Sequence, residues 1–97
     1  MVRVTKHWVV FAVNPLVRAP EGGFGPALRM AVLRANTDTP LVKLGLDDDG
    51  DIFANVELPT EGFSFAHFER ALSALSHAAD KLVVPLLQAQ AIDARNG

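Results

Sequence analysis

The stretch from Leu41 to Leu58, LVKLGLDDDGDIFANVEL, decides the fold class of this chain. Apolar residues alternate with other residues on both sides of an Asp-Gly pair, Asp49 and Gly50. Alternation around such a pair is the strongest hairpin signal that a single sequence offers. The stretch therefore predicts a pair of antiparallel strands joined by a tight loop.

The register of this hairpin follows from which side chains would share a face. A two-residue turn would place Leu44 opposite Asn55 and would mix apolar with polar side chains. Because a slip of one residue moves every side chain to the other face, burial favours a three-residue loop over residues 48–50. Gly50 would then take the left-handed conformation of a type I turn with a G1 bulge. The predicted cross-strand pairs are Asp47–Asp51, Leu46–Ile52, Leu44–Ala54 and Val42–Val56.

Residues 2–13 predict one further strand, because β-branched and aromatic residues dominate them. From Trp8 to Val13 the segment is apolar on both faces. Such a strand is central in its sheet or is covered on its second face. Since one layer of helices cannot easily cover both faces of a sheet, this segment indicates a partner. Asn14 and Pro15 are expected to end the strand.

Two helices are expected on either side of the hairpin. Pro26 favours the start of a helix over about residues 26–35, because its missing N–H would be unpaired at the first helical position. Ser64 is a good N-cap for the second helix, and Phe63 and Phe68 fit a hydrophobic staple around it. The apolar stripe predicted for this second helix consists of Phe65, Phe68, Leu72, Leu75, Ala79 and Leu82.

Pro85 interrupts the pattern of the second helix, since it removes one helical hydrogen bond and clashes with the preceding turn. The sequence therefore predicts a kinked helical tail over residues 85–95. This tail has high helix propensity but few large apolar residues, so it would be marginal alone and is expected to dock on a partner. The large apolar residues are Leu86, Leu87 and Ile92.

The composition excludes several classes of function. The net charge is −2 and the nine Lys and Arg are scattered, so no basic surface for nucleic acid is expected. No apolar stretch approaches the roughly 18 residues of a membrane span. The apolar N-terminal run suits a strand better than a signal peptide, so a cytoplasmic location is expected. The absence of Cys excludes disulfides and Cys-based sites.

The apolar fraction of 49% is high for so short a chain. An Ala-rich helix would explain part of it, because Ala inflates this figure. The interpretation favoured here is that apolar surface is buried against a second chain.

No group of residues predicts a catalytic, cofactor or metal site. The acidic run from Asp47 to Asp51 fails the EF-hand spacing, because Val56 would fall where the bidentate Glu belongs. A solvated hairpin tip is the better interpretation of this run. Ser76, His77 and Asp80 are close in the sequence but would not face one another as a triad on a helix.

An alternative hypothesis is a small-ligand or metal-dependent enzyme whose site forms across a dimer. His67 and His77 would lie nearly three turns apart on one helix, roughly 15 Å, so they cannot share a metal within one chain. A shared site would combine His7, His67 or His77 with Glu61. Glu57 and Glu61 are otherwise expected to be solvated.

Three consecutive segments carry a family resemblance. LRAN at Leu33–Asn36 ends a short helix, LVKLGLDDDGDIFANVELPTEG follows at Leu41–Gly62, and FSFAHFERALSALSHAADKL completes it at Phe63–Leu82. The block from Leu28 to Leu82, a little over half of the chain, resembles the YbjN family. These are bacterial proteins described as sensory-transduction regulators.

The resemblance implies a fold similar to that of the type III secretion chaperones, which dimerise and bind partner polypeptides. It implies no catalytic residues, because the family has none that are established. Family members usually have a helix and more strands before the portion represented here by residues 2–13. Without them, apolar sheet surface would be uncovered, which also favours dimerisation.

Together these observations predict one α+β domain over residues 1–97. It would have a three-stranded antiparallel sheet and two main helices in the order β-α-β-β-α, followed by the kinked tail. The expected function is that of a non-enzymatic homodimer that binds another polypeptide, without a cofactor, a nucleic acid or a membrane. The residues predicted to form the interface are Trp8, Phe11, Leu82, Leu86 and Leu87.

Overall fold

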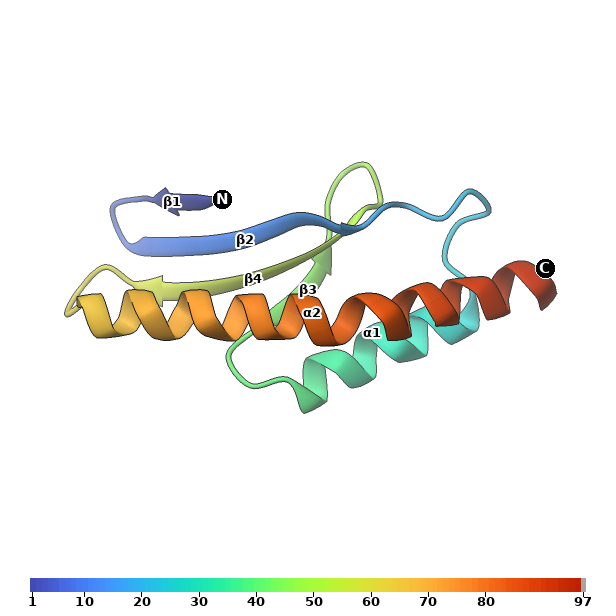
Figure 1. Ribbon diagram of the computed structural model, residues 1–97. Helices are drawn as coiled ribbons and strands as arrows, with labels where there is room; N and C mark the ends of the chain where they lie inside the picture. The colour runs from blue at the N-terminus through green and yellow to red at the C-terminus, as the bar shows by residue number, and fades with distance from the viewer. Residues whose placement is uncertain (97) are drawn as a thin grey trace.

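The computed structural model describes residues 1–96, which form a four-stranded sheet with both helices on one side (Figure 1). The elements are β1 (Val2–Val4), β2 (Trp8–Val17), α1 (Pro26–Asp38), β3 (Lys43–Leu46), β4 (Ile52–Pro59) and α2 (Phe65–Asn96). All strand pairs are antiparallel, and the order across the sheet is β1-β2-β4-β3. The α+β class predicted from the sequence is confirmed.

The hairpin of β3 and β4 has the predicted register and loop. Gly50 has a φ of 82°, in the left-handed region where a Cβ is unfavourable. Its N–H donates to the carbonyl oxygen of Asp47 at 3.0 Å, which closes the three-residue loop. The pairs nearest the loop are Leu46–Ile52 and Leu44–Ala54.

The segment predicted as one strand, residues 2–13, is instead a hairpin of β1 and β2. The chain reverses after Thr5, whose N–H donates to the carbonyl oxygen of Trp8 at 2.8 Å. The Thr5 Oγ1 in turn accepts the N–H of Trp8 at 3.0 Å. The sheet therefore has four strands, and the prediction of three is wrong in this detail. Because β2 lies between β1 and β4, it is the central strand that its apolar residues indicate.

β2 also continues past Asn14 and Pro15, where the sequence predicts its end. The pairing with β4 shifts between Val13 and Val17, and Val17 pairs with Ile52. Pro15 lies inside this irregularity, where its lack of an N–H removes no regular ladder bond. β2 consequently pairs with β4 from one end of β4 to the other.

α2 begins at the predicted cap. The Ser64 Oγ accepts the N–H of His67 at 3.3 Å, and the Ser64 N–H donates to His67 Nδ1 at 3.2 Å. This is a capping box in which a histidine takes the usual place of Glu or Gln. Phe63 and Phe68, the two residues predicted to form a hydrophobic staple, both pack on Phe11, with ring centroids 6.3 and 5.5 Å away.

The buried face of α2 is rotated from the predicted stripe. Phe65 and Leu72, which were predicted to face the core, are exposed. Alanines occupy half of the buried positions and let the helix approach the sheet closely, so larger apolar side chains fall at its flank. The buried residues are Ala71, Leu75, Ala78, Leu82, Leu86 and Ala89. Within residues 1–96, no helix combines the length and the apolar character needed to cross a membrane.

The tail predicted to dock on a partner packs within the same chain. α2 continues through Pro85 as a single helix, and α1 lies against it (Figure 1). Leu86 and Ala89 belong to the core cluster of this chain. We attribute the continuity of the helix to this burial, which offsets the hydrogen bond that Pro85 removes.

Candidate functional site

Three of the residues predicted to form an interface are in the core of a single chain. Phe11, Leu82 and Leu86 belong to the buried cluster between the helices and the sheet. The prediction is corrected for these three, because their neighbours come from the same chain. Trp8 and Leu87 are accessible, at 47% and 49% exposure, and remain candidates for an interface.

An aromatic cluster reaches the surface where α2 begins. The rings of Phe65 and Phe68 stack with centroids 6.2 Å apart, and Phe68 meets Phe11 edge-on at 5.5 Å. The cluster thus leads from the core at Phe11 to Phe65, which is 73% exposed. We call Phe11, Phe63, Phe65 and Phe68 the aromatic end.

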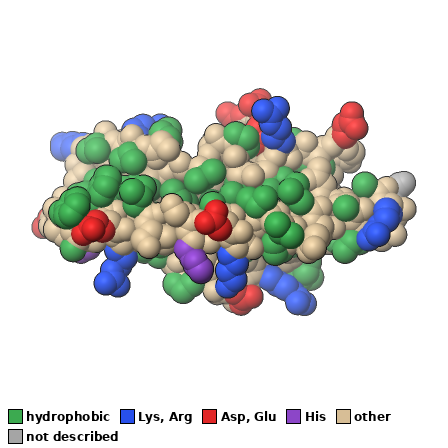
Figure 2. Space-filling model, viewed as in Figure 1, with side chains coloured by type: hydrophobic (Ala, Val, Ile, Leu, Met, Phe, Trp, Pro, Cys, Tyr) green, Lys and Arg blue, Asp and Glu red, His purple; other side chains and the backbone are tan. Residues whose placement is uncertain are grey.

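Further apolar side chains are exposed beside the aromatic end. Val2 and Val4 of β1 pair with Phe11 and Val9, so they share the helix-covered face of the sheet. Neither helix packs on β1, and both valines are exposed. Figure 2 shows hydrophobic side chains gathered at the start of α2 and along its border with the sheet. This part of the helix-covered face has apolar surface but no covering element among residues 1–96.

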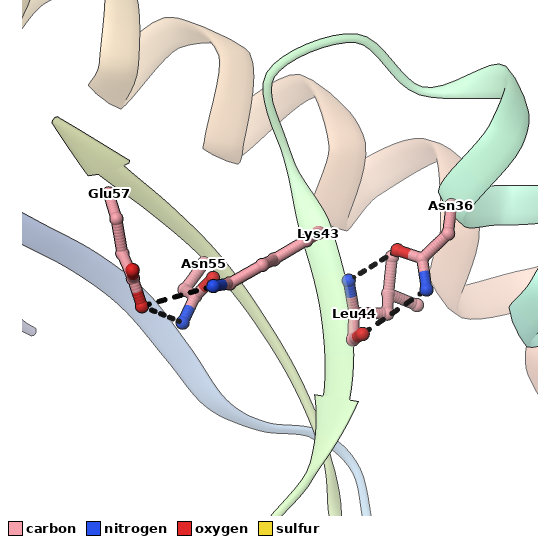
Figure 3. Close-up of polar contacts among 5 residues, drawn as sticks. All are labelled: Asn36, Lys43, Leu44, Asn55 and Glu57. Atoms are coloured by element: carbon pink, nitrogen blue, oxygen red, sulfur yellow. Dashed lines mark hydrogen bonds and ion pairs between the residues drawn. The ribbon is translucent and has the colours of Figure 1, made fainter.

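The opposite face of the sheet carries no helix, and we call it the open face. Asn55 and Glu57 of β4 point to it, because strand residues alternate and their neighbour Val56 lies in the core. Asn55 Nδ2 donates to Glu57 Oε1 at 3.5 Å, and the same oxygen lies 3.2 Å from Lys43 Nζ (Figure 3). Asn55 is only 7% exposed, and its Oδ1 has no hydrogen-bond partner. The open face therefore holds a buried, unpaired acceptor next to an exposed ion pair.

The β3 edge of the sheet is closed by a side chain from α1. The N–H of Leu44 donates to Asn36 Oδ1 at 2.6 Å, and Asn36 Nδ2 donates to the Leu44 carbonyl oxygen at 3.2 Å (Figure 3). Asn36 thus occupies the backbone groups that another strand would need at this point. This contact accompanies an α1 that runs to Asp38, beyond the predicted end near residue 35.

The acidic loop at the tip of the hairpin is stabilised by hydrogen bonds from backbone N–H groups to its own carboxylates. The carboxylate of Asp47 accepts the N–H groups of Asp49 and Asp51 at 2.9 and 3.0 Å. The carboxylate of Asp51 accepts the N–H of Ala19 at 2.7 Å. These contacts give the side chains of Asp47 and Asp51 a structural role in the loop.

In the part of the chain that the structure describes, the histidines belong to no group of three or more metal-ligating side chains. His67 caps α2. The backbone carbonyl oxygen of His7, in the loop between β1 and β2, accepts the N–H of Thr60, which follows β4, at 2.9 Å. His77 is exposed on α2. Among residues 1–96, the ligand atoms of three or more such side chains come together only in the acidic loop, which includes neither Glu61 nor any histidine.

Comparison with protein families settles the relationship of the chain. The YbjN family model, described as "Putative bacterial sensory transduction regulator", matches residues 5–87. The chain belongs to the YbjN family. The match includes β2 and the aromatic end, and it confirms the resemblance seen in the hairpin and the second helix. No curated protein matches this YbjN chain.

The fold of this YbjN protein matches a solved structure. The matched chain comes from the heterodimeric complex ExoU–SpcU of the type III secretion system of Pseudomonas aeruginosa. The TM-score is 0.71 and the identity 22%, over 88% of the YbjN chain and 71% of that chain. The likeness therefore concerns the fold, and it supports the secretion-chaperone-like architecture expected from the sequence.

Two features of this YbjN protein were not predicted from the sequence: the exposure of Phe65 and the unpaired amide oxygen of Asn55. The exposure of Phe65 could have been predicted, because Ala71, Ala78 and Ala89 recur at helical spacing and indicate that a different face of the helix packs closely. The unpaired oxygen also had a signal, since Asn55 is a polar residue between apolar neighbours, Ala54 and Val56, in a strand expected to be buried.

Proposed function

We propose that this chain is a non-enzymatic, dimeric protein-binding module of the cytoplasm, with a chaperone-like or regulatory role. The aromatic end carries the proposal, because Phe65 is 73% exposed although it stacks on a cluster that begins in the core. Contiguous exposed apolar surface marks interaction sites, and large aromatic side chains anchor them. We therefore place a polypeptide partner with apolar side chains at the aromatic end.

The comparisons agree with this proposal at a coarser level. The family is described as regulatory, and the matched solved chain is part of a complex of two different proteins. Among the described residues, Ser64 Oγ and His67 Nδ1 lie 3.1 Å apart, but both residues are exposed and form the cap of α2. This pair therefore does not favour the alternative of an enzyme, whether metal-dependent or acting on a small ligand.

The test compares polypeptides that purify with the chain and with two serine variants. Phe65→Ser removes the exposed ring of the aromatic end. Leu33→Ser is the matched control, because Leu33 is 63% exposed on α1, away from this cluster. We expect one identified polypeptide to bind the unaltered chain and Leu33→Ser, and to be lost from Phe65→Ser.

Thermal unfolding by circular dichroism must show that both variants remain folded. Retention of the polypeptide by a folded Phe65→Ser variant would contradict the placement at the aromatic end. A chain that purifies with a metal or a small ligand and without a polypeptide would favour the enzyme hypothesis.

A further inference from the structure

The open face has an apolar centre along β2. Val9 and Phe11 lie in the core, so Trp8, Val10 and Ala12 point to the other side of the sheet. Val10 and Ala12 are buried although no helix covers them, while Trp8 is half-exposed at the end of the strand. The centre of this face is thus apolar and ends in a large aromatic side chain.

Opposite charges lie on either side of this apolar centre. Arg3 of β1 pairs with Val10, and Val10 pairs with Glu57 of β4. Directly paired residues share a face, so these three side chains form one row across the open face: positive, apolar, negative. Such a row is complementary to itself. A half-turn about an axis along β2 places Arg3 of one copy over Glu57 of the other. Glu57 is also paired with Lys43 of its own chain at 3.2 Å, so the partner's Arg3 would share this carboxylate with Lys43.

The neighbouring row contains the unpaired acceptor. Asn55 pairs with Ala12 on one side and with Lys43 on the other. Its amide nitrogen is turned to Glu57, and its Oδ1 is buried without a donor. Because this oxygen has almost no exposed area in the single chain, a second layer would pack over it rather than supply its donor.

We propose that two copies of this chain associate face to face through the open face, about a two-fold axis along β2. Val10 and Ala12 lie opposite their own counterparts at the centre, where little of their surface is exposed, and the half-exposed Trp8 supplies the main apolar contact at one end. Arg3 pairs with Glu57 of the partner subunit. Sheets that pack in this way lie about 10 Å apart with their side chains interdigitated.

This inference rests on one part of the proposed function, namely that the chain forms a dimer. It assigns the interface to the open face, on the opposite side of the sheet from the aromatic end. Binding of a polypeptide at the aromatic end can therefore succeed or fail independently of it.

The area of the open face limits the expected affinity of the dimer. The four strands have 3, 10, 4 and 8 residues. At about 3.3 Å per residue and about 4.8 Å between strands, they give roughly 400 Å² per copy. Two copies would bury about 800 Å², which is below the size of a stable interface and typical of a weak, transient one. We therefore expect a dimer that dissociates on dilution.

The experiment combines sedimentation equilibrium with the fluorescence of Trp8, the only tryptophan of the chain. Both are measured on the full chain across about two decades of concentration, over which mass action shifts a reversible dimer. We expect the emission of Trp8 to move to longer wavelength as the dimer dissociates. Arg3→Glu should weaken association about tenfold or more, because it places like charges opposite each other.

Two further variants make the charge test specific. Arg34→Glu changes the net charge by the same amount at an exposed position of α1, and should leave the association unchanged. The exchange Arg3→Glu with Glu57→Arg should restore much of the association lost in Arg3→Glu, since the pair reforms with reversed polarity.

A chain that is monomeric at every concentration would overturn the inference. So would a dimer that dissociates without a shift in the emission of Trp8, or one that Arg3→Glu leaves unchanged. A shift of the emission on adding a purified partner polypeptide, with no self-association, would assign the open face to that partner instead.

Discussion

The carboxylate of Asp93 accepts the backbone N–H of Leu28 at 2.9 Å, and so joins the end of α2 to the start of α1. Its other oxygen accepts the N–H of Ala27 at the same distance. α1 has no side-chain cap from its own N-cap residue, which is Gly25. A residue 65 positions away in the sequence therefore supplies the cap.

Removal of this cap should destabilise the fold. We expect Asp93→Ala to lower the free energy of unfolding by about 1–2 kcal/mol, the range for the loss of a helix cap. Urea denaturation followed by circular dichroism measures the change. Asp80→Ala is the control, because Asp80 is exposed on the same helix, and it should change stability by less than about 0.5 kcal/mol. Equal effects of the two variants would show that the cap does not contribute.

Gly25 allows Asp93 to reach the helix start. A Cβ at Gly25 would lie 2.6 Å from both carboxylate oxygens of Asp93, although the backbone there is extended and would accept alanine. We expect Gly25→Ala to displace the carboxylate and to cost about as much as losing the cap, roughly 1–2 kcal/mol. The same denaturation experiment measures it.

The control for this substitution is Gly22→Ala, since nothing lies within 4 Å of a Cβ at Gly22 and its φ is not positive. In the double variant Gly25→Ala with Asp93→Ala, the two effects should not add, because both remove the same cap. Full additivity would mean that Gly25 acts through a different contact.

The hairpin of β3 and β4 could be predicted in detail because local chemistry determines it. The register depends on alternation and on the conformation that Gly50 adopts, and both are readable in the sequence. The break between β1 and β2 was missed because only the short polar segment Thr5–His7 separates apolar runs. The Asp93 cap and the closure of the β3 edge by Asn36 depend on tertiary contacts, which no periodicity reports.

Three residues of the predicted interface, Phe11, Leu82 and Leu86, are buried within the single chain. An apolar residue such as Leu86 can be buried against a partner chain or in the core of its own chain, and a sequence pattern does not distinguish the two kinds of burial. The structure distinguishes them for Leu86, because α2 continues through Pro85 and places Leu86 in the core of its own chain.

Leu86 and Leu87 should differ sharply on truncation, although they are adjacent. Leu86 is 1% exposed and Leu87 is 49% exposed. Leu86→Ala should lower the free energy of unfolding by about 2–5 kcal/mol, because it leaves a cavity in the core. Leu87→Ala should change it by less than about 0.5 kcal/mol. Comparable losses in the two variants, at a concentration where the chain is monomeric, would contradict the assignment of Leu86 to the core.

Asn36 should protect the β3 edge as well as stabilise the fold. Asn36→Ala removes both hydrogen bonds to Leu44, so we expect a loss of about 1–2 kcal/mol in the free energy of unfolding. Asn36→Asp keeps the acceptor for the Leu44 N–H but turns a carboxylate oxygen toward the Leu44 carbonyl oxygen in place of the donor, so it should also lower the free energy of unfolding. Because Asn36→Ala also frees backbone groups at an edge, it should aggregate faster on gentle heating than a variant of equal stability such as Asp93→Ala. Light scattering at matched fractions of unfolded chain measures this, and equal aggregation rates would show that the edge is protected by something other than Asn36.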